Sequence, residues 1–115
     1  MAKLKAVLPS LRERKRYVVF EILSEKKIMD AYKIQMAIEQ AMLHYAGAQG
    51  AASAGMIFLK EAYKDNLGMV KVSNIAVDTL KGALTFITHI ENDEVIIRSK
   101  GVSGSIKKTD KFTAS

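Results

Sequence analysis

Residues 8–23 of the chain read LPSLRERKRYVVFEIL, a basic segment that passes directly into an apolar one. Pro9 disfavours helix just before the basic segment, and the residues after the arginines are β-branched and aromatic, which favours a strand. Because strand side chains alternate between two faces, Val18, Phe20 and Ile22 form one wholly apolar face, opposite a mixed one. The pattern predicts a strand inside a sheet, with one face in the core.

Length and composition indicate a globular chain. Its 115 residues are typical of one domain, and the 49% hydrophobic content supports a core rather than disorder. No apolar run approaches the roughly 20 residues that cross a bilayer, so we expect a soluble, cytoplasmic protein without membrane contact. The chain has no cysteine, which excludes disulfides and thiolate metal sites.

Positive charge is concentrated at the two ends of the sequence. Residues 1–16 carry six basic and one acidic side chain, and residues 98–115 carry five basic and one acidic. The segment between them, residues 17–97, has seven basic and ten acidic side chains. We predict a basic N-terminal arm over 1–16, a core over 17–100 and a basic Gly/Ser tail over 101–115. This distribution suits a polyanionic partner, although charged tails that only maintain solubility would give the same composition.

The spacing of apolar residues predicts four strands and two core helices. We expect strands at 17–23, 56–60, 69–72 and 95–98, and a short additional helix at 49–54. Capping residues for the core helices are Asp30 and the Ser73-Asn74 pair, and polar turns are expected at 64–68 and 91–94. Gly82, inside the second core helix, indicates a close approach to another backbone.

The order βαββαβ predicts the fold class. It is typical of an α+β, ferredoxin-like or RNA-recognition-like two-layer sandwich, a four-stranded antiparallel sheet with both helices on one face. The first and third strands would be central, and the other face of the sheet would be open to a partner.

Residue patterns typical of catalysis are missing from the sequence. His44 and His89 lack metal-ligand spacing, and no Gly-rich phosphate loop joins a strand to a helix. Asp93 and Glu94 are best explained as part of a solvated turn. We therefore expect no catalytic residue, no metal site and no cofactor bound by the protein.

The predicted fold makes RNA a natural candidate partner. RNA-recognition domains stack bases on the open sheet face, but the third strand here has no aromatic residue and Tyr17 is the one candidate on a central strand. Phosphate contacts from the terminal segments are favoured instead, because arginine binds phosphate through two N–H groups. In Gly101–Lys108, glycine backbone N–H groups, serine hydroxyls and lysines can approach an anion.

Three segments carry a resemblance to a known family. They are LPSLRERKRY at 8–17, MVKVSN at 69–74 with the helix that follows it, and GVSGSIKK at 101–108. In this order the chain resembles the ribonuclease P protein component 2 family, of archaeal type with eukaryotic counterparts. Ser105 stands where threonine is usual in that family.

The resemblance implies an RNA-recognition-like fold and a non-catalytic subunit of the ribonucleoprotein that removes the 5′ leader from precursor tRNA. In that assembly the RNA performs the cleavage with Mg²⁺ at its own catalytic centre. The protein would bind and stabilise the catalytic half of the ribonuclease P RNA. It would also pair with a TIM-barrel subunit, ribonuclease P protein component 3, in a heterotetramer that allows a homodimer contact.

Carried over to matching positions, the resemblance gives a set of RNA-contact candidates at the two ends of the sequence. These are Arg12, Arg14, Lys15, Arg16, Ser103, Gly104, Ser105, Lys107 and Lys108. Basic residues on or next to the predicted strands complete the set, namely Lys71, Arg98 and Lys100.

Two other interpretations of the residues stay open. A ferredoxin-like homodimerisation or small-ligand regulatory module would use Val19, Met69 and Ile96 on the second sheet face as its interface. Such a module would form a dimer insensitive to salt and would carry no RNA. Another RNA-binding protein of the same topology, such as a ribosomal one, would bind a different RNA.

Overall fold

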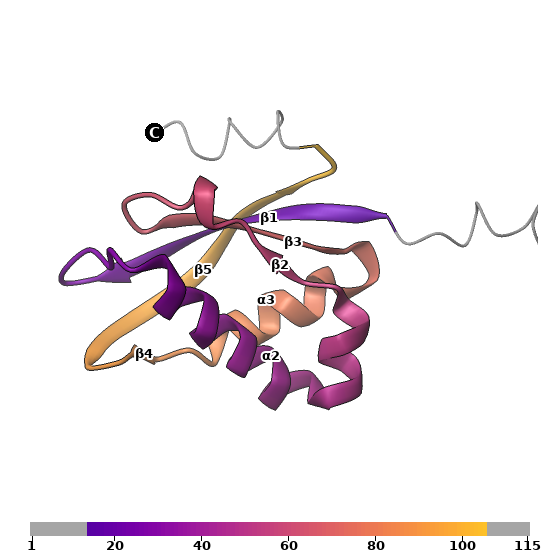
Figure 1. Ribbon diagram of the computed structural model, residues 1–115, viewed down its shortest axis with the longest axis horizontal. Helices are drawn as coiled ribbons and strands as arrows, with labels where there is room; N and C mark the ends of the chain where they lie inside the picture. The colour runs from indigo at the N-terminus through magenta and orange to yellow at the C-terminus, as the bar shows by residue number, and fades with distance from the viewer. Residues whose placement is uncertain (1–13, 106–115) are drawn as a thin grey trace, which may run out of the picture.

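The computed structural model describes residues 14–105, which form one antiparallel sheet and two helices. The helices α2 and α3 lie side by side against the sheet (Figure 1). This confirms the α+β class and the antiparallel sheet. The strands are β1 (Lys15–Ser24), β2 (Ile57–Phe58), β3 (Leu67–Ser73), β4 (His89–Ile90) and β5 (Asp93–Ser103), and the helices are α2 (Ala31–Ala54) and α3 (Val77–Thr85).

The central strand is β1, in a sheet with the order β2-β3-β1-β5-β4. Val18, Phe20 and Ile22 of β1 are buried in the main core, as their spacing predicts. They pack against side chains of both helices, which places the two helices on the same side of β1. The largest fully buried helical side chains in this core are those of Ile34, Ile38, Met42, Leu80 and Leu84.

The sheet has five strands where the sequence predicts four. The added strand, β4, pairs through His89 and Ile90 with the start of β5. It is two residues long, too short to give a period of alternation, and the buried side chain of Ile90 anchors it. Asp93 and Glu94 belong to β5 rather than to the predicted turn at 91–94, and Glu91 has a positive φ of 56° in the connection between the strands.

The long helix α2 has two limbs. Asp30 caps it as predicted, accepting a hydrogen bond from the Tyr32 backbone N–H at 3.0 Å. At Gly47 the backbone leaves the helical conformation, with φ 79° and ψ 169°, so the predicted short helix at 49–54 is the second limb. Gly55 then ends the helix in the left-handed conformation.

Several predicted boundaries are wrong. The strand predicted at 69–72 covers Leu67–Ser73, and the one predicted at 95–98 covers Asp93–Ser103. The second strand covers only Ile57–Phe58 rather than 56–60, because a 3₁₀ turn at Lys60–Ala62 follows it. The pair Ser73-Asn74 does not cap α3. A 3₁₀ turn at Asn74–Ala76 intervenes, and Ser73 makes no side-chain capping bond. Within the described residues the buried Ser73 hydroxyl has no hydrogen-bond partner.

The second face of the sheet is partly closed. Val19 and Met69, which pair across β1 and β3, are buried at 0% and 6% exposure, while Ile96 on β5 is 62% exposed. Of the three residues assigned to a homodimer interface, only Ile96 therefore presents substantial apolar surface.

Candidate nucleic-acid interface

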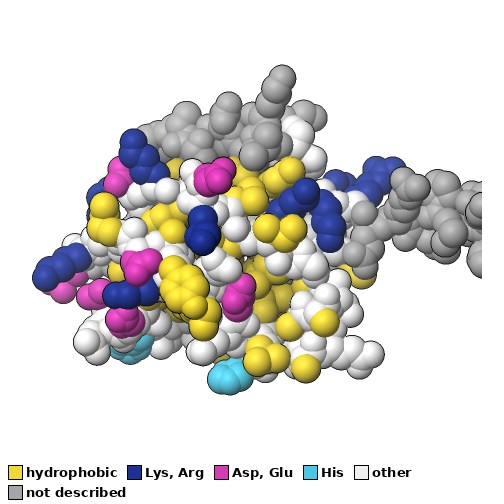
Figure 2. Space-filling model, in the orientation of Figure 1, with side chains coloured by type: hydrophobic (Ala, Val, Ile, Leu, Met, Phe, Trp, Pro, Cys, Tyr) yellow, Lys and Arg dark blue, Asp and Glu magenta, His cyan; other side chains and the backbone are white. Residues whose placement is uncertain are grey.

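Basic residues that are distant in sequence meet at the end of the sheet where β1 begins. Tyr17 of β1 lies between Lys71 of β3 on one side and Ser103 of β5 on the other. Arg14 and the first residues of β1 therefore lie beside the end of β3 and the Ser103–Ser105 turn. Figure 2 shows Lys and Arg side chains gathered in this region. The candidates Arg12, Lys107 and Lys108 lie outside the described residues.

Arg16 lies against the glycine of the C-terminal turn. A Cβ atom placed on Gly104 would come within 3.3 Å of Arg16 Nη1, which itself donates to the Lys15 carbonyl oxygen. Arg14 is exposed, and its carbonyl oxygen accepts a 2.6 Å hydrogen bond from the Asn74 backbone N–H. The backbone is thus anchored where these two guanidinium groups leave the sheet. Both have the planar fork of donors that suits phosphate.

The serines of the C-terminal turn form an internal hydrogen-bond network. The Ser103 hydroxyl is buried, accepts a bond from the Ser105 backbone N–H at 3.2 Å and donates to the Ser105 carbonyl oxygen at 2.9 Å. This arrangement turns the chain and leaves Gly104 exposed beside Arg16. The Ser103 hydroxyl therefore shapes the turn, and Gly104 is the exposed residue of that turn.

Lys15 points toward a helix end. A Cβ on Gly55, the residue that ends α2, would lie 2.6 Å from Lys15 Nζ. The ammonium group is therefore at the C-terminus of α2, where the partial negative charge of the helix stabilises a cation. Lys15 thus links the first residue of β1 to the long helix.

The cations of β5 lie beside one carboxylate. Arg98 forms an ion pair with Glu21 through its Nε, and Lys100 Nζ is 4.0 Å from the other Glu21 oxygen. A bulge between Val19 and Phe20 shifts the register of β5 here. Arg98 is directly opposite Glu21, and Lys100, two residues further along β5, is the diagonal neighbour of Glu21, so both cations reach this one side chain of β1. Their positive charge is partly balanced within the protein.

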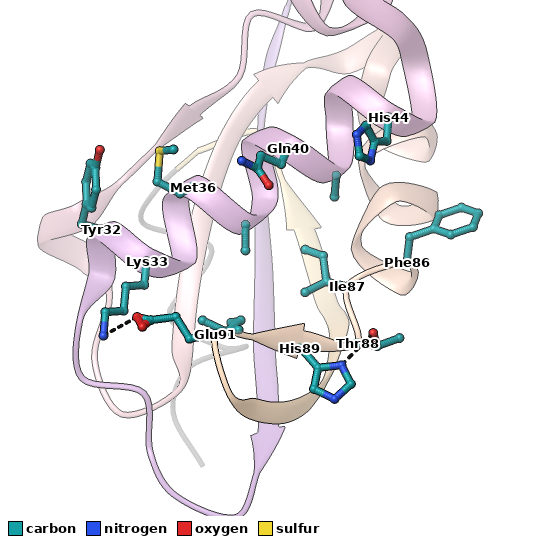
Figure 3. A pocket seen from close by; sticks show the side chains of 13 residues that line it. Tyr32, Lys33, Met36, Gln40, His44, Phe86, Ile87, Thr88, His89 and Glu91 are labelled. Atoms are coloured by element: carbon teal, nitrogen blue, oxygen red, sulfur yellow. Dashed lines mark hydrogen bonds and ion pairs between the residues drawn. The ribbon is translucent and has the colours of Figure 1, made fainter.

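A groove between α2 and the α3–β4 connection was missed by the sequence analysis. It has a volume of about 430 Å³, and Tyr32, Met36, His44, Phe86 and His89 are among the residues that line it (Figure 3). Phe86 is 66% exposed and its ring lies 5.1 Å from that of Tyr45 on α2. Phe86 lies just beyond the end of α3 and outside its apolar stripe, so the helical periodicity gives no signal for it.

The groove does not have the charge of an RNA site. Lys33 and Glu91 form an ion pair at its edge, and this contact with Glu91 raises the pKa of Lys33 (Figure 3). His44 and His89 line the same groove although they are distant in sequence. Within residues 14–105, no group of three or more potential ligands could hold a metal ion. The same part of the chain contains no helix of the length and hydropathy that crossing a membrane requires.

Comparison with known proteins assigns the family. The sequence profile of the Rpp14/Pop5 family matches residues 16–114, which is most of the chain. The chain belongs to the Rpp14/Pop5 family. Among the relatives of this family member is ribonuclease P protein component 2 of Archaeoglobus fulgidus, 40% identical over 105 residues, 91% of this chain and 93% of the relative. The resemblance to that family is confirmed.

Further relatives of this Rpp14/Pop5 member have the same name. Ribonuclease P protein component 2 of Thermococcus kodakarensis is 37% identical over 106 residues, 92% of this chain and 88% of the relative. A chain in the cryo-EM structure of yeast ribonuclease MRP has a TM-score of 0.64 over 82% of this chain and 76% of that chain. At 14% identity, this likeness concerns the fold.

Proposed function

We propose that this Rpp14/Pop5 family member is a non-catalytic protein subunit of ribonuclease P. It binds and stabilises the catalytic RNA for removal of the 5′ leader from precursor tRNA. The observation that carries the proposal is the presence of Arg14, Arg16 and Lys71 at one end of the sheet, where Arg16 lies against the exposed Gly104. Relatives named ribonuclease P protein component 2 support it.

The chemistry of this end of the sheet suits phosphate binding. Arginine offers paired donors to phosphate oxygens, and exposed glycine brings backbone N–H groups within reach of an anion. Such contacts position the protein on RNA without reading its bases. In this account the RNA carries the cleavage chemistry and holds the Mg²⁺, and the protein contributes no catalytic residue.

The proposal extends to the assembly. By resemblance to its family, the chain pairs with a TIM-barrel subunit, ribonuclease P protein component 3. Two such pairs form a heterotetramer in which two copies of this chain touch, and precursor tRNA is reached through the holoenzyme in the cytoplasm. Exposed apolar side chains at the helix groove, including Tyr32, Met36 and Phe86, leave surface for protein contacts.

We further infer that the fold is an extended RNA-recognition-like one. Strands β2, β3, β1 and β5 lie in the order of a ferredoxin-like sheet, and β4 adds a fifth strand next to β5.

A tagged copy of the protein, purified from its source cells at moderate salt, tests the proposal. We expect one structured RNA and a TIM-barrel protein to copurify, and the eluate to cleave precursor tRNA at the 5′ leader. The double variant Arg14→Ala, Arg16→Ala, which we expect to lose RNA binding, serves as the matched control. Recovery of the wild-type protein alone, as a homodimer insensitive to salt, would contradict the proposal and favour a dimerisation module.

A further inference from the structure

We propose that Lys71 is a phosphate contact contributed by the sheet itself, and that Tyr17 is the residue that positions it. The inference rests on the proposed RNA-binding function. Tyr17 and Lys71 are directly opposite each other in the β1–β3 pairing, so their side chains leave the sheet on the same face. Lys71 Nζ lies over the Tyr17 ring, 5.8 Å from its centroid.

The ring holds the ammonium group without neutralising it. An aromatic face attracts a cation through its quadrupole but carries no formal charge. Among residues 14–105, no carboxylate lies within ion-pair distance of Lys71 Nζ. An incoming phosphate would therefore not have to compete with a carboxylate of these residues for Lys71.

Arg98 provides the contrast on the same face of the sheet. Its guanidinium group is paired with Glu21, and Lys100 lies next to the same carboxylate. A phosphate at Arg98 would have to compete with Glu21 and would meet its negative charge at close range. The structure thus distinguishes Lys71 from Arg98, although the sequence predicts both as RNA contacts.

The supporting backbone is well fixed. Both β1 and β3 are internal strands, and Val18, Val70 and Val72 beside the pair are 0% exposed on the core face. A free lysine side chain loses rotamer freedom when it binds. Contact with the Tyr17 ring restricts Lys71 beforehand, which lowers that cost. Tyr17 also pairs with Ser103, so Lys71 lies at the same end of the sheet as Arg16 and Gly104. Because side chains alternate along β1, Lys71 adds its charge on the face opposite to that of Arg16.

The proposal is tested by measuring how binding to ribonuclease P RNA depends on salt concentration. The RNA is that of the source organism, transcribed in vitro. Lys71→Ala should lower the slope of log K against log salt by about one unit. The matched control Arg98→Ala, which removes the same charge, should change the slope much less. Thermal unfolding checks each variant, and Lys71→Gln provides a second neutral side chain if the alanine variant does not fold.

Substitutions at Tyr17 separate positioning from direct contact. Tyr17→Phe keeps the ring and should bind as the wild type does, whereas Tyr17→Leu should weaken binding about two- to five-fold. In a protein that already has Lys71→Ala, Tyr17→Leu should have no further effect, since a positioning residue acts through the residue that it positions.

Several results would overturn the inference. An unchanged salt slope for Lys71→Ala would show that Lys71 contacts no phosphate. Equal losses from Tyr17→Leu with and without Lys71 would mean that the ring contacts RNA directly, as in base stacking. Equal losses from Tyr17→Phe and Tyr17→Leu would assign the effect to the hydroxyl. Wild-type protein that does not bind this RNA would instead refute the proposed function, and this inference with it.

Discussion

Gly68 of β3 lies opposite Phe20 of β1, in a space with no room for a side chain. A Cβ atom there would be 2.5 Å from Phe20 Cζ and 3.1 Å from Tyr63 Cδ1. Phe20 is completely buried, so its ring cannot move aside. We expect Gly68→Ala to reduce the free energy of unfolding by about 1–3 kcal/mol, measured by denaturant unfolding.

Gly82 of α3 is the matched control for this prediction. A Cβ there would also be close to another residue, 2.5 Å from Tyr45 Oη, but the Tyr45 side chain is 48% exposed and can swing into solvent. The close approach is thus to a side chain and not to a backbone. Alanine also favours helix over glycine, so Gly82→Ala should cost much less than Gly68→Ala. A larger loss at Gly82 would contradict this view of the packing.

Asn66 joins three parts of the chain. Its side-chain oxygen accepts a hydrogen bond from the Ile28 backbone N–H at 2.8 Å, and its amide nitrogen donates to the Ile22 carbonyl oxygen at 3.0 Å and to Ser24 Oγ at 2.9 Å. Its φ of 65° is one that glycine adopts freely. Asn66→Gly therefore removes only the side chain, and we expect a loss of about 2–4 kcal/mol in denaturant unfolding from the unpaired backbone groups.

The neighbouring Asp65 gives a matched test of this network. It has a φ of 51°, it is exposed, and no hydrogen bond of its side chain is recorded among the described residues. Asp65→Gly should leave the unfolding free energy nearly unchanged. Equal effects of the two substitutions would indicate that backbone conformation, not the Asn66 side chain, determines stability here. The sequence identifies this stretch as a turn, but the bonds of Asn66 to residues 22–28 depend on contacts about 40 positions apart, which no local pattern reveals.

At the scale of elements, periodicity predicts best where burial is one-sided. It locates β1 because apolar residues recur at every second position there. It locates both core helices because their apolar residues recur every three or four positions over several turns. It misses β4, with two residues, and most of β5, where Ser99 and Gly101 have weak strand preference. Residues 95–103 of β5 pair with β1, and this pairing keeps Ser99 and Gly101 extended. Tertiary contacts thus override local preference at the elements that were missed.

The kink in α2 gives a prediction at this scale. Gly47 has φ 79° and ψ 169°, a conformation that residues with a Cβ rarely adopt, and no atom lies within 4 Å of a Cβ placed on it. We expect Gly47→Ala to destabilise the protein by about 1–3 kcal/mol through backbone strain alone, measured by thermal unfolding. Ala48→Gly, at an exposed position beside it, is the control and should cost less than about 1 kcal/mol. A neutral Gly47→Ala would mean that the two limbs can join as one straight helix.

For the whole molecule, charge and topology together define the candidate interface. The sequence shows that positive charge lies at both ends of the chain, and the antiparallel pairing of β1 with β3 and β5 brings the start of one strand beside the ends of two others. The sequence cannot show that Lys15 is directed to the end of α2 or that Arg98 is paired with Glu21. These assignments depend on which side chains become neighbours, so they required the structure.

The salt dependence of binding to ribonuclease P RNA tests the central claim most directly. Arg14→Ala with Arg16→Ala removes two charges at the basic end of the sheet, and Lys26→Ala with Lys27→Ala removes two exposed charges beyond the far end of β1. Each lost phosphate contact lowers the slope of log K against log salt by about 0.7–0.9 units. We predict that the arginine pair lowers the slope by about 1.4–1.8 units while the lysine pair leaves it nearly unchanged. Equal slopes for the two double variants would contradict RNA binding at this end of the sheet.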